Sequence, residues 1–186
     1  MQLSEEILSD MVNVINRRLQ HLRDRIGVSR DPVGWARRQG VRVGERSRFI
    51  GVGIETFGSE PYLVSLGDDC TVTAGVRFIT HDGGAHVARS VRPQLDVVAP
   101  IVLGDRVFVG MEAVFMPGVT VGDNVVVGAR SVVTRDVPSG TVVAGMPAKP
   151  VSDIDTYVER LTARGDDTFG MSPREKRRFY EDKYGL

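Results

Sequence analysis

The feature that most constrains the fold of this chain is a six-residue period. Aliphatic or aromatic residues recur at Leu103, Val109, Phe115, Val121, Val127 and Val133. The positions four residues after these are also apolar or small: Val107, Ala113, Val119, Val125, Ser131 and Val137. Four of the repeat starts are followed directly by glycine, at positions 104, 110, 122 and 128. A period of six fits neither an α-helix nor a hairpin ladder. It predicts short parallel strands that wind into a prism, with repeat starts inside and glycines where a side chain would crowd a corner.

The same period is visible earlier in the chain, at Leu66, Val72 and Phe78, and more raggedly at Val43 and Phe49. An ordinary β-sandwich would show turn signals every ~8 to 12 residues rather than a constant period of six. We therefore expect a prism domain over residues 41–151, after an N-terminal helical segment at 1–40 and before a C-terminal helical tail at 152–186. The predicted fold class is all-β, with only short helices at the two ends.

The open ends of such a prism need caps. Apolar residues in the first segment follow helical spacing and are expected to provide one cap: Ile7, Leu8, Met11, Ile15, Leu19, Leu22 and Ile26. Asp31 and Pro32 predict the start of a short second helix that ends at Gly40. Near the other end, the segment 172–175 reads Ser-Pro-Arg-Glu, which is a capping box for a further helix.

The repeat loses its register between Phe78 and Leu103, which predicts an extruded loop at residues 82–98. His81 stands at the start of this loop, and rigid scaffolds commonly present chemistry on loops. Imidazole suits proton transfer near neutral pH, so His81 is the candidate general base. A carboxylate is expected to orient its ring, and Asp82, Glu60 and Asp69 are all candidates. His86, further along the loop, is more typical of a surface histidine.

Further motifs lie at residues 60–68, 78–83, 121–125 and 133–138, the last followed by Ala-Gly-Met-Pro-Ala-Lys at 144–149. Together with the repeat, they resemble the hexapeptide-repeat acyltransferase family, in particular its maltose, galactoside and capsular polysaccharide O-acetyltransferases. The resemblance covers roughly residues 41–151. It implies a left-handed parallel β-helix, an exception to the usual right-handed crossover, and a homotrimer with active sites between subunits.

The resemblance also implies an activity, the acetyl-CoA-dependent O-acetylation of a saccharide hydroxyl in polysaccharide or surface-glycan biosynthesis, by direct transfer. The backbone N–H of Gly110 would stabilise the oxyanion. Contacts to the coenzyme map to Met111, Ala129, Thr134 and Lys149. Galactoside members carry serine where this chain has Met111, and Ser152 replaces a second basic residue after Lys149. Candidate acceptor-binding residues are Glu60, Arg89 and Arg92, since arginines could hold an acidic acceptor.

Composition narrows the range of partners and compartments. Lys plus Arg and Asp plus Glu each number 24, so no net charge favours nucleic acid. No stretch approaches the roughly 20 apolar residues of a membrane span, and the first ten residues do not look like a signal peptide. Cys70 is the only cysteine and stands at an inward position, so we expect a small core residue rather than a nucleophile, in a cytoplasmic protein.

The same sequence features are compatible with other functions. Gamma-class carbonic anhydrases share the prism, and His81 and His86 are spaced like two of their zinc ligands. A third ligand is missing, because the other histidine, His21, falls in the N-terminal helix; we therefore predict no metal. The remaining alternatives are an N-acetyltransferase of an amino-sugar nucleotide, an antibiotic acetyltransferase, and a non-catalytic β-helix scaffold.

Overall fold

The computed structural model describes residues 2–186, without the side chains of residues 2–6, 8 and 17. The side chain of Leu8, one of the predicted cap residues, therefore lies outside the described residues. The chain forms two compact units, which divide between Ile154 and Asp155.

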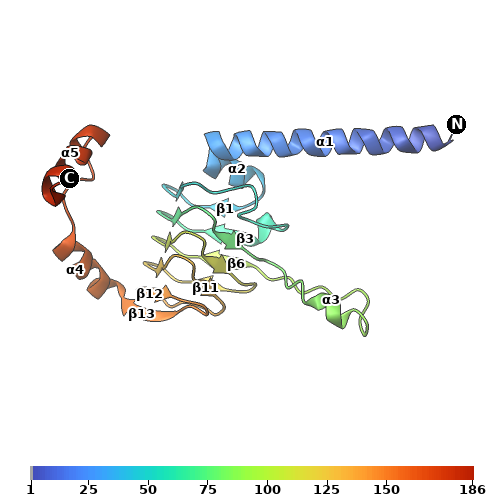
Figure 1. The fold of residues 1–186 in the computed structure, drawn as a ribbon. Coiled ribbons are helices and arrows are strands. Elements are labelled where there is room, and N and C mark those ends of the chain that lie inside the picture. The colour runs from blue at the N-terminus through green and yellow to red at the C-terminus, as the bar shows by residue number, and fades with distance from the viewer. Residues whose placement is uncertain (1) are drawn as a thin grey trace. The chain divides into compact units, whose positions relative to one another are not determined.

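The larger unit is a prism of short strands stacked in three sheets (Figure 1). The first sheet holds, in order, β1 (Arg42–Val43), β3 (Val64–Leu66), β6 (Ile101–Leu103) and β9 (Thr120–Val121). The second holds β2 (Arg48–Phe49), β4 (Thr71–Val72), β7 (Phe108–Val109), β10 (Val126–Val127), β12 (Thr141–Ala144) and β13 (Lys149–Asp153). The third holds β5 (Arg77–Phe78), β8 (Val114–Phe115) and β11 (Val132–Val133). Every pairing is parallel except that of β12 with β13, so the predicted parallel β-helix is confirmed.

Strand register shows where the coils are regular and where the chain leaves them. Partners such as Val102 and Thr120 are 18 residues apart, which is three repeats of six. Ser65 and Val102 pair across 37 residues, so 19 residues are inserted in that coil. Most of the insertion is the predicted loop, which contains α3 (Ala85–Ala88). A β-bridge between His81 and Val98 closes its base.

The inside of the prism is filled by the two repeat positions that the sequence predicts. The six repeat starts from Leu103 to Val133 are at most 2% exposed, and the positions from Val107 to Val137 are at most 6% exposed. A column of stacked rings runs through the coils, with ring centroids 5.4 Å apart for Phe57 and Phe78 and 5.0 Å apart for Phe78 and Phe115. Burial of these apolar side chains is the main source of stability for the coil.

The repeat glycines are needed because neighbouring coils stack closely at the corners. A Cβ added to Gly110 would lie 2.5 Å from the backbone nitrogen of Ala129. The left-handed backbone conformation falls on other corner residues, such as Arg106 and Asn124, whose φ angles are 55° and 54°. The side chains of these two residues are hydrogen-bonded to each other, with Arg106 Nε 2.6 Å from Asn124 Oδ1.

The N-terminal cap differs from the prediction. Helix α1 (Gln2–Arg30) is followed by α2 (Pro32–Arg38), whose N-cap Asp31 accepts a hydrogen bond from the Gly34 N–H. Trp35 and Ala36 of α2 are buried in the core, and Val28 of α1 packs against it. The apolar residues of α1 from Ile7 to Ile26 that the structure describes are instead 45–57% exposed. The cap is therefore formed by α2 and the end of α1, because the rest of α1 extends beyond the first coil (Figure 1).

The N-terminal helix is not short as predicted, because α1 alone has 29 residues, so the all-β description applies to the prism and not to the helical ends. The smaller unit is also helical and contains most of α4 (Ile154–Arg164) and all of α5 (Pro173–Tyr184). The predicted capping box is confirmed: the Ser172 side chain accepts from the Glu175 N–H, and the Glu175 side chain accepts from the Ser172 N–H. Lys183 of α5 forms an ion pair with Asp166 within this unit.

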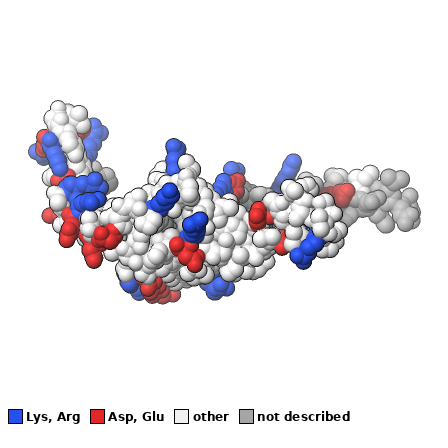
Figure 2. Space-filling view, turned by 90° about the horizontal axis from the view of Figure 1, so that it is seen from below, with Lys and Arg blue, Asp and Glu red and all other residues white. Residues whose placement is uncertain are grey.

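Acidic and basic side chains are interspersed on the face seen in Figure 2, as expected for equal numbers of each. Some are paired between neighbouring coils, for example Arg46 with Asp69 and Arg130 with Glu112. Within residues 2–186, no helix combines the length and apolar character needed to cross a membrane.

Candidate active site

The candidate base His81 lies three residues after β5, where the loop leaves the third sheet. Its neighbour Thr80 is fully buried, and the Thr80 carbonyl accepts a hydrogen bond from the Ala99 N–H at 2.8 Å. The Asp82 N–H donates to the Val97 carbonyl at 2.9 Å. The two ends of the loop are therefore tied together on both sides of His81, and its side chain, 40% exposed, stands on a fixed backbone.

Glu60 is the carboxylate that the fold brings to the imidazole. Its Oε2 lies 3.0 Å from Nδ1 of His81 and accepts a hydrogen bond of 2.6 Å from the Thr80 hydroxyl. Glu60 is positioned by the segment just before the short 3-10 helix at Pro61–Leu63. The Thr80 hydroxyl and then His81 lower the pKa of the Glu60 carboxyl below its ordinary value.

The other two carboxylates considered from sequence have different partners. Asp82 Oδ1 accepts from the Gly84 N–H at 2.8 Å, which forms a turn inside the loop. Asp69 accepts two hydrogen bonds from the Arg46 guanidinium, from Nε at 2.8 Å and from Nη2 at 2.7 Å. Of the three candidates, only Glu60 therefore contacts the imidazole.

A pocket of about 340 Å³ opens beside His81. Its wall is largely apolar and includes Phe78 and Ile79, and an ion pair between Arg77 and Glu55, 2.6 Å long, lies at its edge. Sequence reasoning singled out neither Arg77 nor Glu55. Glu55 stands in the irregular part of the first coil, where the six-residue period gives no signal.

The predicted loop residues lie apart from this pocket. The Arg89 Nε donates to the Leu95 carbonyl at 2.9 Å, and its guanidinium lies 3.9 Å from Asp96. Arg92 and His86 are exposed in the same loop. The structure therefore uses Arg89 to hold the loop together and does not bring it to His81.

The N–H of Gly110 is already used within the prism. It donates to the Val127 carbonyl at 2.8 Å, as part of the ladder between coils. A backbone N–H has a single hydrogen, so this group has none left to donate to an oxyanion.

The residues that the family resemblance assigns to coenzyme binding lie on two different edges of the prism. Met111 and Ala129 each stand two residues after a strand of the second sheet, β7 and β10, and both are exposed. Thr134 directly follows β11 of the third sheet, the sheet whose strand β5 precedes His81. Lys149 is the first residue of β13 and is exposed. One chain therefore does not bring Met111 and Ala129 to His81.

Cys70 is fully buried, and burial raises the pKa of its thiol. Its Sγ lies 3.1 Å from the Gly104 carbonyl, so the predicted role as a small core residue is confirmed. Among the described residues, no group of three or more His, Cys, Asp or Glu side chains could hold a metal ion.

Comparison with known proteins agrees with the fold. The family described as "Bacterial transferase hexapeptide (six repeats)" matches residues 100–135, and the "Hexapeptide repeat of succinyl-transferase" matches residues 64–79. The chain is 43% identical to protein CapG of Staphylococcus aureus over 148 residues, which cover 80% of this chain and 86% of CapG. It therefore belongs to the hexapeptide-repeat acetyltransferase family, and it is an acyltransferase.

Two further relatives refine this assignment. The chain is 35% identical to the galactoside O-acetyltransferase of Escherichia coli, over 52% of this chain and 47% of that enzyme. A solved structure of galactoside acetyltransferase in complex with coenzyme A superposes with a TM-score of 0.53 at 26% identity, over 69% of this chain and 61% of that one. The chain thus spans most of CapG but only about half of the galactoside enzyme.

Proposed function

We propose that this protein is an acetyl-CoA-dependent O-acetyltransferase that acts on a saccharide hydroxyl, with His81 as the general base. The observation that carries the proposal is the Glu60–His81 pair at the edge of the 340 Å³ pocket. Hydrogen bonding of Nδ1–H to Glu60 would leave Nε2 unprotonated and able to accept a proton.

The direct-transfer reaction needs one base and no covalent enzyme intermediate. Nε2 of His81 takes the proton of the acceptor hydroxyl as its oxygen attacks the thioester carbonyl of acetyl-CoA. The tetrahedral oxyanion then collapses to the acetyl ester and expels the thiolate, which takes the proton back from the imidazolium. Glu60 stabilises that imidazolium and holds the ring in one orientation.

The choice of donor and acceptor follows the relatives. The matching galactoside acetyltransferase structure contains coenzyme A, and the Escherichia coli relative is named as a galactoside O-acetyltransferase. The resemblance to polysaccharide O-acetyltransferases favours a place in polysaccharide or surface-glycan biosynthesis, and the acceptor itself is to be found by experiment. We also propose the left-handed sense of the coil, since the chain belongs to a family with that fold.

We further propose a homotrimer in the cytoplasm, with each active site formed between two chains. His81 follows the third sheet, whereas Met111 and Ala129 follow strands of the second. A second copy that presents its second-sheet edge to His81 would complete the coenzyme site. An oxyanion donor other than the Gly110 N–H is also required, and a neighbouring copy could supply it.

The test is release of free thiol from acetyl-CoA in the presence of neutral mono- and disaccharides, amino-sugar nucleotides and chloramphenicol. We expect a saccharide to accelerate release, and His81→Ala to lower turnover by about 10²- to 10⁴-fold while it stays folded. His86→Ala, in the same loop, is the matched control and should remain active. Equal turnover by wild type and His81→Ala would refute the role of His81, and acceleration only by an amine acceptor would replace O- with N-acetylation.

A further inference from the structure

A second cavity lies directly beside the pocket at His81. It also has a volume of about 340 Å³, and the two cavities share the lining residues Glu55 and Gly58. It lies between the N-terminal helices and the irregular segment of the first coil that contains Ile54 and Pro61. A molecule bound at His81 that is longer than one pocket could therefore continue into this cavity past Glu55.

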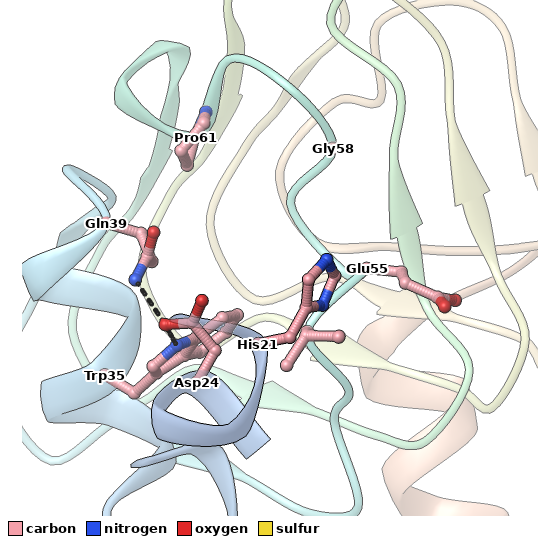
Figure 3. Close-up of a pocket in the computed structure, with 8 residues that line it drawn as sticks. His21, Asp24, Trp35, Gln39, Glu55, Gly58 and Pro61 are labelled. Carbon is pink, nitrogen blue, oxygen red and sulfur yellow. Dashed lines mark hydrogen bonds between the residues drawn. The ribbon is translucent and has the colours of Figure 1, made fainter. Parts of the chain in front are cut away.

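The walls of this cavity combine polar groups with apolar surface (Figure 3). On one side, Asp24 Oδ1 accepts hydrogen bonds of 3.2 Å from both Trp35 Nε1 and Gln39 Nε2. These bonds fix the carboxylate of Asp24 and the amide of Gln39. On another side lie His21 and Glu55, which are both exposed. The apolar part of the wall includes Ile54 and Pro61, which are half-buried, whereas Trp35 borders the cavity but is only 4% exposed.

These features fit a saccharide ring better than the other acceptors considered. Sugar hydroxyls donate to carboxylates and exchange hydrogen bonds with amides, while the C–H face of the ring packs on apolar surface such as that of Ile54 and Pro61. The volume lies at the lower end of the ~300–1,000 Å³ range of small-molecule pockets, which suits a ring rather than a large aglycone.

The charged side chains that line this cavity favour some saccharides over others. Asp24 and Glu55 both carry carboxylates, and Arg77 is already paired with Glu55 at 2.6 Å. The charge of Glu55 is thus balanced, but a nucleotide diphosphate or a uronic acid in this cavity would still meet the carboxylate of Asp24, and like charges disfavour binding. The cavity is therefore suited to an uncharged sugar.

We propose that the acceptor is a neutral oligosaccharide, and that the Asp24 cavity binds the sugar unit next to the one acetylated at His81. This inference rests on the proposed function, because it takes His81 as the place of reaction. It adds that the minimal good acceptor has two sugar units and carries no phosphate or carboxylate in the second.

The first experiment compares kcat/KM for neutral disaccharides and for their component monosaccharides. We expect kcat/KM to be about tenfold or more higher for the disaccharide, because its second sugar unit would form hydrogen bonds to a charged group in the cavity. In Asp24→Asn and in His21→Ala, the ratio of kcat/KM for the disaccharide to kcat/KM for the monosaccharide should fall towards one. Asp10→Asn, the same substitution about four turns earlier on α1, is the matched control and should keep the preference.

Trp35 allows binding to be measured without turnover, since it is the only tryptophan in the chain. In the full-length protein, neutral disaccharides should change its fluorescence, also in the His81→Ala variant, whereas UDP-N-acetylglucosamine should not. His21→Ala removes one exposed wall residue and leaves the bonds of Asp24 to Trp35 and Gln39 in place, so it separates loss of the site from loss of folding.

The outcomes distinguish this inference from the function on which it rests. Equal kcat/KM for mono- and disaccharides, with no fluorescence change, would overturn the second subsite and leave the O-acetyltransferase intact. A fluorescence change that depends on His21, without turnover of any saccharide, would support the subsite and overturn the proposed reaction. A preference for a nucleotide sugar would overturn the inference.

Discussion

Glu60 and His81 are 21 residues apart in the chain, yet Glu60 Oε2 lies 3.0 Å from the imidazole Nδ1. The same oxygen accepts a hydrogen bond from the buried Thr80 hydroxyl, so the carboxylate is held from two sides. Such a pair holds the imidazole ring in one orientation.

Removal of the orienting carboxylate should slow the reaction without abolishing binding of acetyl-CoA. We expect Glu60→Ala to lower kcat by about 10- to 100-fold, as is typical when a group that supports a functional histidine is lost. Glu60→Gln, which keeps a hydrogen-bond acceptor, should lose less. Thr80→Val is the matched control for the buried side chain, and it should lower kcat less than Glu60→Ala. A rise in KM for the acceptor with unchanged kcat would indicate that Glu60 binds the acceptor instead.

The stability that Glu60 contributes should depend on pH. Because hydrogen bonds from Thr80 and His81 lower the pKa of Glu60 from its ordinary 4.5 in the folded state, folding favours the ionised carboxylate. This contribution is fully present above the unfolded-state pKa and is lost as the pH falls through the lower, folded-state pKa. Urea unfolding at about pH 7 and about pH 3 should show that the advantage of wild type over Glu60→Gln shrinks in acid. An advantage that grows in acid would contradict this assignment.

The ring column inside the prism should contribute strongly to stability. Phe115 is fully buried and stacks on Phe78, so Phe115→Ala should lower the free energy of unfolding by about 3–5 kcal/mol. Phe108, in the same coil, is 44% exposed and provides the control. Denaturant unfolding of both alanine variants should show a much smaller loss for Phe108→Ala.

Gly110 should be required for stacking of the coils. A Cβ there would meet the Ala129 backbone nitrogen at 2.5 Å, so Gly110→Ala should cost about 1–3 kcal/mol through overpacking. Gly83 in the exposed loop has no atom within 4 Å of such a Cβ, and Gly83→Ala should change stability by less than about 0.5 kcal/mol. The melting temperatures of the two variants, measured by thermal unfolding, check this difference. An unchanged melting temperature for Gly110→Ala, together with loss of activity, would instead favour a direct role in catalysis.

Shared active sites would be revealed by subunit mixing. His81→Ala and Ala129→Trp should each be inactive alone, because one lacks the base and the other blocks the proposed coenzyme groove. If each site takes His81 from one chain and Ala129 from the next, an equal mixture refolded together should recover about a quarter of wild-type activity. A mixture as inactive as its components would place both residues in the same chain's site.

The sequence by itself determined the coil, the inward positions and the place of the loop. The same positions are buried in every coil. The six-residue period from Leu103 to Val133 was therefore enough to predict which side chains lie inside. The break in that period located the 19-residue insertion and the histidine at its start.

Only the tertiary structure decided what surrounds His81. Glu60 and Glu55 stand in the irregular part of the first coil, where no period relates a residue to its neighbour. Their partners are set by how that segment stacks on β5 and beneath α1. The exposure of α1 was likewise invisible in the sequence, since helical spacing predicts an apolar face but not whether the rest of the fold reaches far enough to cover it. Periodic burial is a local property that the sequence repeats at every coil, whereas contacts between irregular segments depend on the single arrangement in which the whole chain packs.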